Sequence, residues 1–321
     1  MRLTGRIWRE FRNGDPDKEK VRHMLWLKNE RLSVEIAEPG EEPNNGVRFE
    51  RAGFISQVTL DGNCTFCASE PRNLVHRSSG GRGLCCEYKA DYSAQVQDGE
   101  WYPKPGVGLL KRNGAYHFSG EYEKKPFLVE VARDEGGQET GATFHTIPVE
   151  CLGIAVETWK HIYIDGNTLT MEVKARNAGS REITFKEYCH NFLSIDGMAV
   201  SPDYRLELPD LTGLEKGMLG NEYPNEGNYL SDGKGISLAQ NTLLPSLLMI
   251  RAEEAPRPFH WTMRHKGAGA AVKVTENLNV SEMCLWSVDH MLSPEMIQTV
   301  TLAPGEETMW SRVYTFEQSA R

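Results

Sequence analysis

Residues 161–173 read HIYIDGNTLTMEV, and this stretch decides the fold class. Apolar and polar residues alternate from Leu169 to Ala175, which is the pattern of a strand with one buried face. The residues Asp-Gly-Asn at 165–167 separate two such runs and are typical of a tight turn between neighbouring strands. The sequence therefore predicts an antiparallel hairpin at this point.

The same pattern recurs along the chain, and we count about eighteen strands by this procedure. Further turn signals lie at Asp61-Gly62, Asn113-Gly114, Ala178-Gly179, Asp232-Gly233 and Pro304-Gly305. Helical periodicity is scarce, and one short amphipathic helix is expected near residues 2–12. Without helices as crossovers the strands must be mostly antiparallel, so we expect an all-β fold, a large antiparallel β-sandwich with little helix.

Composition excludes several classes of protein. The chain has 321 residues, 36 Lys and Arg against 45 Asp and Glu, and a formal net charge of −9. This charge argues against nucleic acid and against an anionic membrane surface as partners. No apolar run approaches the roughly 20 residues of a membrane helix, and the N-terminus lacks the apolar core of a secretory signal. We therefore expect a cytoplasmic protein.

Seven cysteines are present, at positions 64, 67, 85, 86, 151, 189 and 284. Their odd number and irregular spacing favour reduced thiols. Cys64 and Cys67 form one C-x-x-C, but a structural zinc site needs a second pair. We expect buried apolar thiols, no metal and no cofactor, since no nucleotide motif is present.

One segment differs in composition from the strands. Residues 210–235 are rich in Gly, Asn, Pro and Glu, and they indicate a surface loop longer than usual connections. This segment is a candidate functional loop or lid.

Polar residues lie inside apolar strand segments at several places. His190 and Asn191 lie in EYCHNF, Glu87 in GLCCEY, and Arg48 in GVRFER. Further candidates are Lys104, Trp286, Asp289, Glu295 and, in a weaker context, His265. On one face of a sheet such residues would form a pocket suited to a sugar, because hydroxyls need polar partners and sugar C–H faces stack on aromatic rings.

Each candidate also has a structural interpretation. A histidine on a strand is more often a hydrogen-bonded core residue than a catalyst. Glu87 could pair with Arg82, and Arg48 could be a solvated charge on an edge strand. Glu295 follows a proline and could be a turn residue, and Asp289 could form a surface pair with the next residue. A metal site built on strands would require two histidines at H-x-H spacing, and this spacing is absent from the sequence.

Several strings together resemble the galactose mutarotase-like, or aldose 1-epimerase-like, superfamily. In order, they are NNGVRFERAGFISQVTLDG, GGRGLCCEY, KPGVGLLKRNGAYHFSGEYE, EYCHNFLSIDG, CLWSVDHMLSPE and LAPGEETMWSRVYTF. The resemblance covers roughly residues 30–317, and it implies a single β-supersandwich domain over 26–321 with an N-terminal extension over 1–25. The branch it resembles is divergent and bacterial.

The resemblance implies interconversion of sugar anomers by acid–base catalysis. His190 matches the family's histidine acid, and Asn191 would contact a sugar hydroxyl. Trp286 stands where the family's glutamate base would be, so Glu295 from the following loop, or else Asp289, is expected to supply the carboxylate. The family's second histidine is missing, and Lys104 could act there on a hydroxyl or an acidic substituent.

Three functions follow as alternatives. The first is an active mutarotase, which predicts that Glu295 and His190 face each other across a sugar ring. The second is a carbohydrate-binding protein without catalysis, with Arg48, Glu87, Lys104 and Trp286 lining a groove. The third is another sugar reaction on this scaffold, such as elimination or glycoside cleavage. In each case the expected partner is a small sugar or sugar derivative, acidic sugars included.

Overall fold

A computed structural model describes residues 24–41, 46–70, 80–114, 122–134, 140–208, 228–252 and 255–319. The short helix expected near residues 2–12 lies outside this part of the chain. Residues 115–118, directly after the turn signal at Asn113-Gly114, also lie outside it, as do positions 210–227 of the expected long loop. The N-terminal extension and the domain boundary stay predictions.

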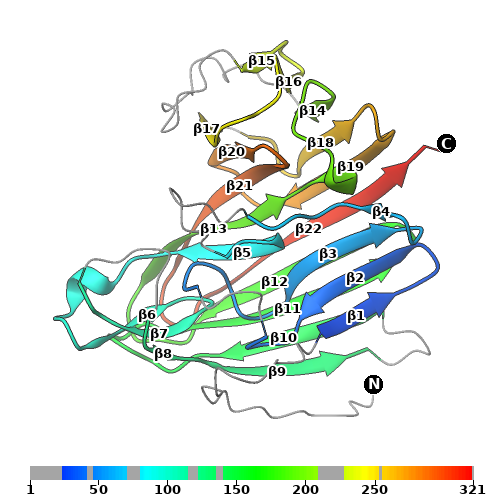
Figure 1. The fold of residues 1–321 in the computed structure, drawn as a ribbon. Helices are drawn as coiled ribbons and strands as arrows, with labels where there is room; N and C mark the ends of the chain where they lie inside the picture. The colour runs from blue at the N-terminus through cyan, green and yellow to red at the C-terminus, as the bar shows by residue number, and fades with distance from the viewer. Residues whose placement is uncertain are drawn as a thin grey trace, which may run out of the picture.

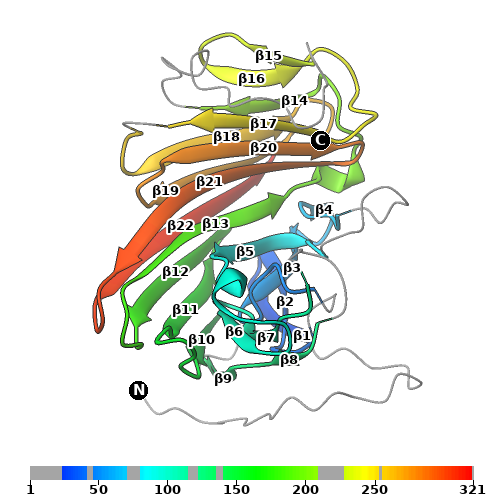
Figure 2. The same ribbon diagram turned by 90° about the vertical axis from the view of Figure 1, so that its left-hand side faces the viewer.

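Two large antiparallel sheets form the body of the molecule (Figures 1 and 2). In the described residues, the nine-stranded sheet has the order β1 (Met24–Lys28), β2 (Leu32–Ala37), β3 (Phe54–Leu60), β5 (Gly83–Lys89), β13 (Ile183–Phe192), β21 (Met291–Leu302), β20 (Glu282–Val288) and β17 (Ser246–Arg251), with β4 (Cys64–Thr65) paired to β3. The ten-stranded sheet has the order β15 (Tyr229–Ser231), β16 (Gly235–Leu238), β14 (Tyr204–Glu207), β18 (Phe259–His265), β19 (Ala270–Asn277), β22 (Glu307–Gln318), β12 (Thr168–Asn177), β11 (Val156–Asp165), β10 (Gly141–Ile147) and β9 (Leu128–Arg133).

A third, small sheet lies near β5 (Figure 2). It contains β6 (Trp101–Lys104), β7 (Gly108–Lys111) and β8 (Lys124–Lys125). Two short 3₁₀ turns, η1 (Ser93–Gln95) and η2 (Ile195–Gly197), are the helical elements of the described residues. The predicted antiparallel all-β architecture is confirmed.

The hairpin predicted from residues 161–173 is formed by β11 and β12, and Asp165 pairs with Thr168 across the turn. Gly166 has a φ of +53°, a conformation that glycine adopts without strain. Two other turn signals do not form hairpins within one sheet. Residues 178–179 lead from β12 to β13, and residues 304–305 lead from β21 to β22, so both connect strands of different sheets.

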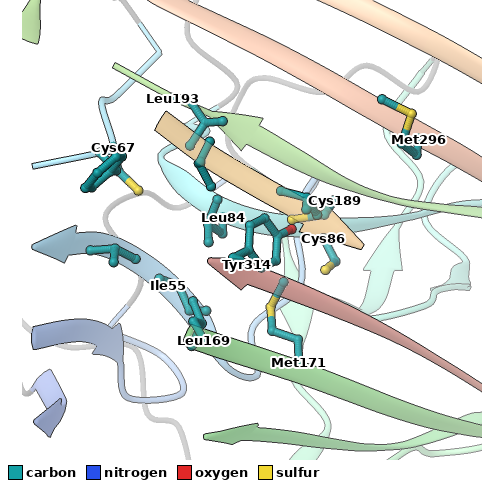
Figure 3. Close-up of a cluster of buried hydrophobic side chains, with 14 of the residues drawn as sticks. Ile55, Cys67, Leu84, Cys86, Leu169, Met171, Cys189, Leu193, Met296 and Tyr314 are labelled. Atoms are coloured by element: carbon teal, nitrogen blue, oxygen red, sulfur yellow. The ribbon is translucent and has the colours of Figure 1, made fainter. Parts of the chain in front are cut away.

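The main core lies between the two large sheets. Figure 3 shows Ile55 and Leu84 of the nine-stranded sheet facing Leu169, Met171 and Tyr314 of the ten-stranded sheet. All five are buried. The alternation that predicted the strands therefore also selects the side chains that bind the sheets together, by burial of apolar surface.

Three sequence-based expectations change in detail. The described residues hold 22 strands rather than about eighteen, because two- to four-residue strands are too short for a period-two pattern. Residues 229–231, expected within a long loop, form β15 and pair with β16. The seven cysteines are all free thiols, and all but Cys151 are buried.

In the described part of the chain, no helix is long and apolar enough to cross a membrane.

Candidate functional site

The candidate site lies on β13, whose side chains alternate between two environments. Cys189 and its inward-facing neighbours enter the core between the large sheets. Tyr188 and Phe192 belong to separate clusters on the other side of the nine-stranded sheet. We call that side the outward face. His190 lies on it, between Tyr188 and Phe192.

His190 is held between two carboxylates from the neighbouring strands. Its Nδ1 is 2.8 Å from Oε1 of Glu295 on β21, and its Nε2 is 3.0 Å from Oε2 of Glu87 on β5. His190 is 2% exposed and Glu295 is 4% exposed. The three side chains form a continuous line across three strands, which we call the Glu87–His190–Glu295 row.

Further donors converge on Glu87. Arg48 donates from Nε to Oε2 at 2.8 Å, and the Tyr188 hydroxyl donates to the same oxygen at 2.7 Å. The ammonium of Lys104 lies 3.9 Å from Oε1 and donates to the Tyr88 carbonyl. Three positively charged or polar side chains therefore surround one fully buried carboxylate.

These contacts set the protonation states of the row. Burial would raise the pKa of Glu87, but Arg48, His190 and Lys104 outweigh it and hold the pKa well below its usual value. Burial would lower the pKa of His190, but the charge of Glu295 and hydrogen bonds to both carboxylates raise it. Burial lowers the pKa of Lys104 to about 8. Glu87 is therefore a permanent anion near neutral pH.

The row needs one more proton than a neutral imidazole carries. An ionised carboxylate only accepts hydrogen bonds, so Nε2 must carry a proton toward Glu87. The contact between Nδ1 and Glu295 needs a second proton. The raised pKa of His190 favours imidazolium. The row is therefore best described as an imidazolium that donates to both carboxylates.

Five predicted residues come together: Arg48, Glu87, Lys104, His190 and Glu295. The arrangement differs from the expected one in two ways. Glu295 lies inside a strand, β21, and not in a loop. It also contacts His190 directly, whereas we expected a sugar ring between them. Trp286 lies on the same face, half-buried against the apolar clusters beside the row.

Three predicted residues lie outside the group of side chains in and around the row. Asn191 is fully buried on the inward face, because consecutive side chains of a strand point to opposite faces. Asp289 lies in the turn after β20, and its Oδ1 is 2.7 Å from Nδ1 of His290. His265 belongs to the ten-stranded sheet, packs edge-on against Tyr204 and lines a separate hollow.

Sequence reasoning missed three residues of the site. Tyr188 donates to Glu87, Ser293 donates to Glu295 at 2.9 Å, and the ring of Phe49 packs edge-on against the His190 imidazole. The spacing of the sequence could have identified two of them. Tyr188 and Ser293 each lie two positions before a candidate residue on a strand, and the period of two places them on the same face.

The described residues contain no group of three or more His, Cys, Asp or Glu side chains arranged to hold a metal ion. In the row itself the ring nitrogens of His190 and one oxygen of each carboxylate hydrogen-bond one another. The arrangement is suited to proton transfer, because an imidazole between two carboxylates can both donate and accept a proton.

Neither known family models nor curated protein sequences match this chain. Solved structures do match. A galactose mutarotase-like protein from Lactobacillus casei is 12% identical with a TM-score of 0.57, over 92% of this chain and 100% of that one. A galactose mutarotase related enzyme from Lactobacillus acidophilus is 14% identical with a TM-score of 0.55, over 92% and 98%. A galactose mutarotase-like protein from Clostridium acetobutylicum is 11% identical with a TM-score of 0.55, over 93% and 96%.

These likenesses establish the fold. The chain forms the all-β sandwich of galactose mutarotase-like proteins, as its sequence strings predicted. At such low identity the fold alone follows, so the function must be argued from the side chains.

Proposed function

We propose that the protein interconverts the anomers of a free sugar, with His190 as the acid and Glu295 as the base. One observation carries this proposal: the imidazole of His190 lies within hydrogen-bond distance of both Glu87 and Glu295 on the outward face of a mutarotase-like sandwich. Anomer exchange needs a proton removed from the anomeric hydroxyl and a proton given to the ring oxygen. It needs no cofactor.

The proposed reaction begins when the sugar replaces the contact between His190 and Glu295. The Glu295 carboxylate takes the proton of the anomeric hydroxyl, and the Nδ1–H of His190 gives its proton to the ring oxygen. The bond between the ring oxygen and C1 breaks, and C1 becomes an aldehyde. After rotation about C1–C2 the ring closes on the other face, and both protons return to the groups that held them.

Glu87 acts in this proposal by holding the imidazole. Its carboxylate accepts from Nε2, which fixes the ring orientation and directs Nδ1 toward Glu295. Arg48, Lys104 and Tyr188 keep Glu87 ionised and in place. Trp286, beside the row, would support the apolar face of the sugar.

A second candidate function is sugar binding without catalysis. The 2.8 Å contact between His190 and Glu295 favours it, because the pair must separate before either group can reach a substrate. Both candidates place the ligand on the outward face and differ in whether anomers exchange.

Exchange spectroscopy by NMR tests the proposal. Anomer exchange is followed for a panel of aldohexoses, pentoses and uronic acids, with wild type, Glu295→Gln and Glu282→Gln. Glu282 is the matched control, since it lies on the neighbouring strand and pairs with Lys186 away from the row. We expect Glu295→Gln to lose about 100-fold or more of the enzymatic rate and the control to keep it.

Buffer rates for every sugar with wild-type protein would exclude catalysis on the panel. Calorimetry then decides the second candidate. Heat of binding with wild type but no exchange would support a binding protein, and absence of both would remove both candidates for these sugars.

A further inference from the structure

The pairing of β13 with β21 is interrupted beside the site. The ladder runs as far as Glu187 opposite Gln298 and resumes at one bridge, Leu193 opposite Leu292. The register on the two sides of the interruption is the same, so no residue is inserted. His190 and Glu295 therefore lie opposite each other inside the interruption, where continuous backbone pairing does not fix the distance between the strands.

Pro294 prevents one of the backbone pairs that are missing in this interruption. Leu193 and Leu292 exchange both backbone hydrogen bonds, at 2.9 and 3.0 Å. Hydrogen-bonded pairs recur every second residue in an antiparallel ladder, so Asn191 and Pro294 would form the next one. Proline has no N–H to donate. The pairing with β20 on the other side of β21 is kept, with Leu285 opposite Pro294.

The side chain of Asn191 replaces the missing pairing. Its amide nitrogen donates to the Pro294 carbonyl at 2.5 Å and to the Cys189 carbonyl at 3.3 Å. Its amide oxygen accepts from the Tyr314 hydroxyl at 2.8 Å. Asn191 and Tyr314 are both fully buried. In Figure 3 the Tyr314 side chain reaches from β22 toward Cys189 on β13.

We infer that Asn191 is a positioning residue, which sets the spacing of His190 and Glu295 through its bonds to Pro294 and Tyr314. Asn191 is bonded covalently to His190, and Pro294 to Glu295, so the amide bond on the inward face fixes two backbones whose next side chains meet on the outward face. This role replaces the sugar contact expected for Asn191.

The inference rests on the proposed function only where it concerns rate. Its structural part, the spacing of the two side chains, can be measured without any sugar. A displacement of about 1 Å at a reacting pair can reduce rates about 100-fold. A change in the spacing of His190 and Glu295 should therefore also lower the rate of anomer exchange.

The test uses Asn191→Leu, which keeps the branched side-chain shape and removes the amide, with Asn177→Leu as matched control. Asn177 is also fully buried, and its amide nitrogen donates to the β21 carbonyl of Leu302 at 2.9 Å, far along the strand from the row. We follow the imidazole protons and the pKa of His190 by NMR, and the melting temperature of each variant.

We expect both variants to melt at lower temperature, while Asn191→Leu alone shifts the Nδ1 proton signal and lowers the pKa of His190. If Asn191→Leu fails to fold, Tyr314→Phe removes one hydroxyl and should shift the same signal by a smaller amount. An unchanged His190 signal and pKa in a folded Asn191→Leu, or in Tyr314→Phe when the first does not fold, overturns the inference.

Anomer exchange gives the second readout. For any sugar on which wild type is active, we expect Asn191→Leu to reduce kcat about tenfold or more with little change in KM. If wild type shows no exchange at all, the proposed function fails, and the NMR signals of His190 still decide the role of Asn191.

Discussion

The two faces of β13 carry buried charges of different kinds. On the inward face, Arg312 donates to both oxygens of Glu187 at 2.8 and 2.9 Å and to Glu276 at 2.9 Å. On the outward face, the same strand carries His190 between Glu87 and Glu295. We call the first group the Arg312 network.

The Arg312 network and the row differ in whether their hydrogen-bond donors can lose a proton near neutral pH. Glu187 also accepts from Gln298, and Glu276 also accepts from Trp261, so every donor of the Arg312 network keeps its proton at any ordinary pH. The row is instead centred on an imidazole, which gains and loses a proton near neutrality. The comparison separates a network whose donors stay protonated from a row whose central group can gain and lose a proton.

Arg312→Met should have the largest effect on stability. It leaves Glu187 and Glu276 buried without their shared cation, so we expect the free energy of unfolding to fall by about 3–5 kcal/mol. Urea unfolding measures it. Arg264→Met is the control, because Arg264 forms an exposed pair with Glu207 and should cost about 1 kcal/mol or less. Similar losses in the two variants would contradict the structural role of the Arg312 network.

Glu87→Gln should have the next largest effect. The amide keeps the shape but leaves Arg48, Lys104 and His190 without their common anion, and we expect a loss of about 2–3 kcal/mol. The pKa of His190 should fall, because Glu87 no longer stabilises its charged form. NMR titration of His190 measures this shift. An unchanged pKa of His190 would show that Glu87 does not stabilise the protonated imidazole.

Tyr188→Phe should have a smaller effect. It removes one hydrogen bond to Glu87 from an otherwise unchanged ring, and we expect a loss of about 1–2 kcal/mol in unfolding free energy. Thermal unfolding measures it. Tyr229→Phe is a control, since its hydroxyl contacts Ser287 instead of a charged group and should cost less.

The pH dependence of stability should be the smallest of these effects when measured over a single pH unit, at most about 1.4 kcal/mol for one group. Because the folded pKa of His190 is raised, its contribution is complete below its unfolded pKa and is lost as pH rises through the folded pKa. Because the folded pKa of Glu87 is lowered, its contribution is complete above its unfolded pKa and is lost as pH falls through the folded pKa. Both are complete between about pH 4.5 and 6.5.

Urea unfolding across pH 4–9 checks this window, with His190→Gln as the comparison. The variant should lose the decline on the basic side of the window. If the unfolding free energy of the variant falls with the same slope above this window, the decline belongs to titratable groups other than His190.

Strand alternation made part of the site predictable. His190 and Glu87 stood out as polar residues in apolar strand segments, Glu295 was expected from a following loop, and the structure brings all three together. The same alternation, applied more strictly, would have separated Asn191 from His190, because adjacent residues of a strand face opposite sides. His265 could not be excluded in this way, since alternation does not tell which sheet a strand joins.

The antiparallel all-β class, the hairpin at 161–173 and the resemblance to mutarotase-like proteins could be predicted from the chain alone, because period-two burial and turn chemistry are local properties of a sequence. The position of β13 between β5 and β21 follows from the folded arrangement of the strands and from no local pattern. That order brings His190 into contact with carboxylates more than 100 residues away in each direction. Such contacts depend on the pairing of distant strands and on the alignment of β13 with β21 around Pro294, which no local pattern encodes.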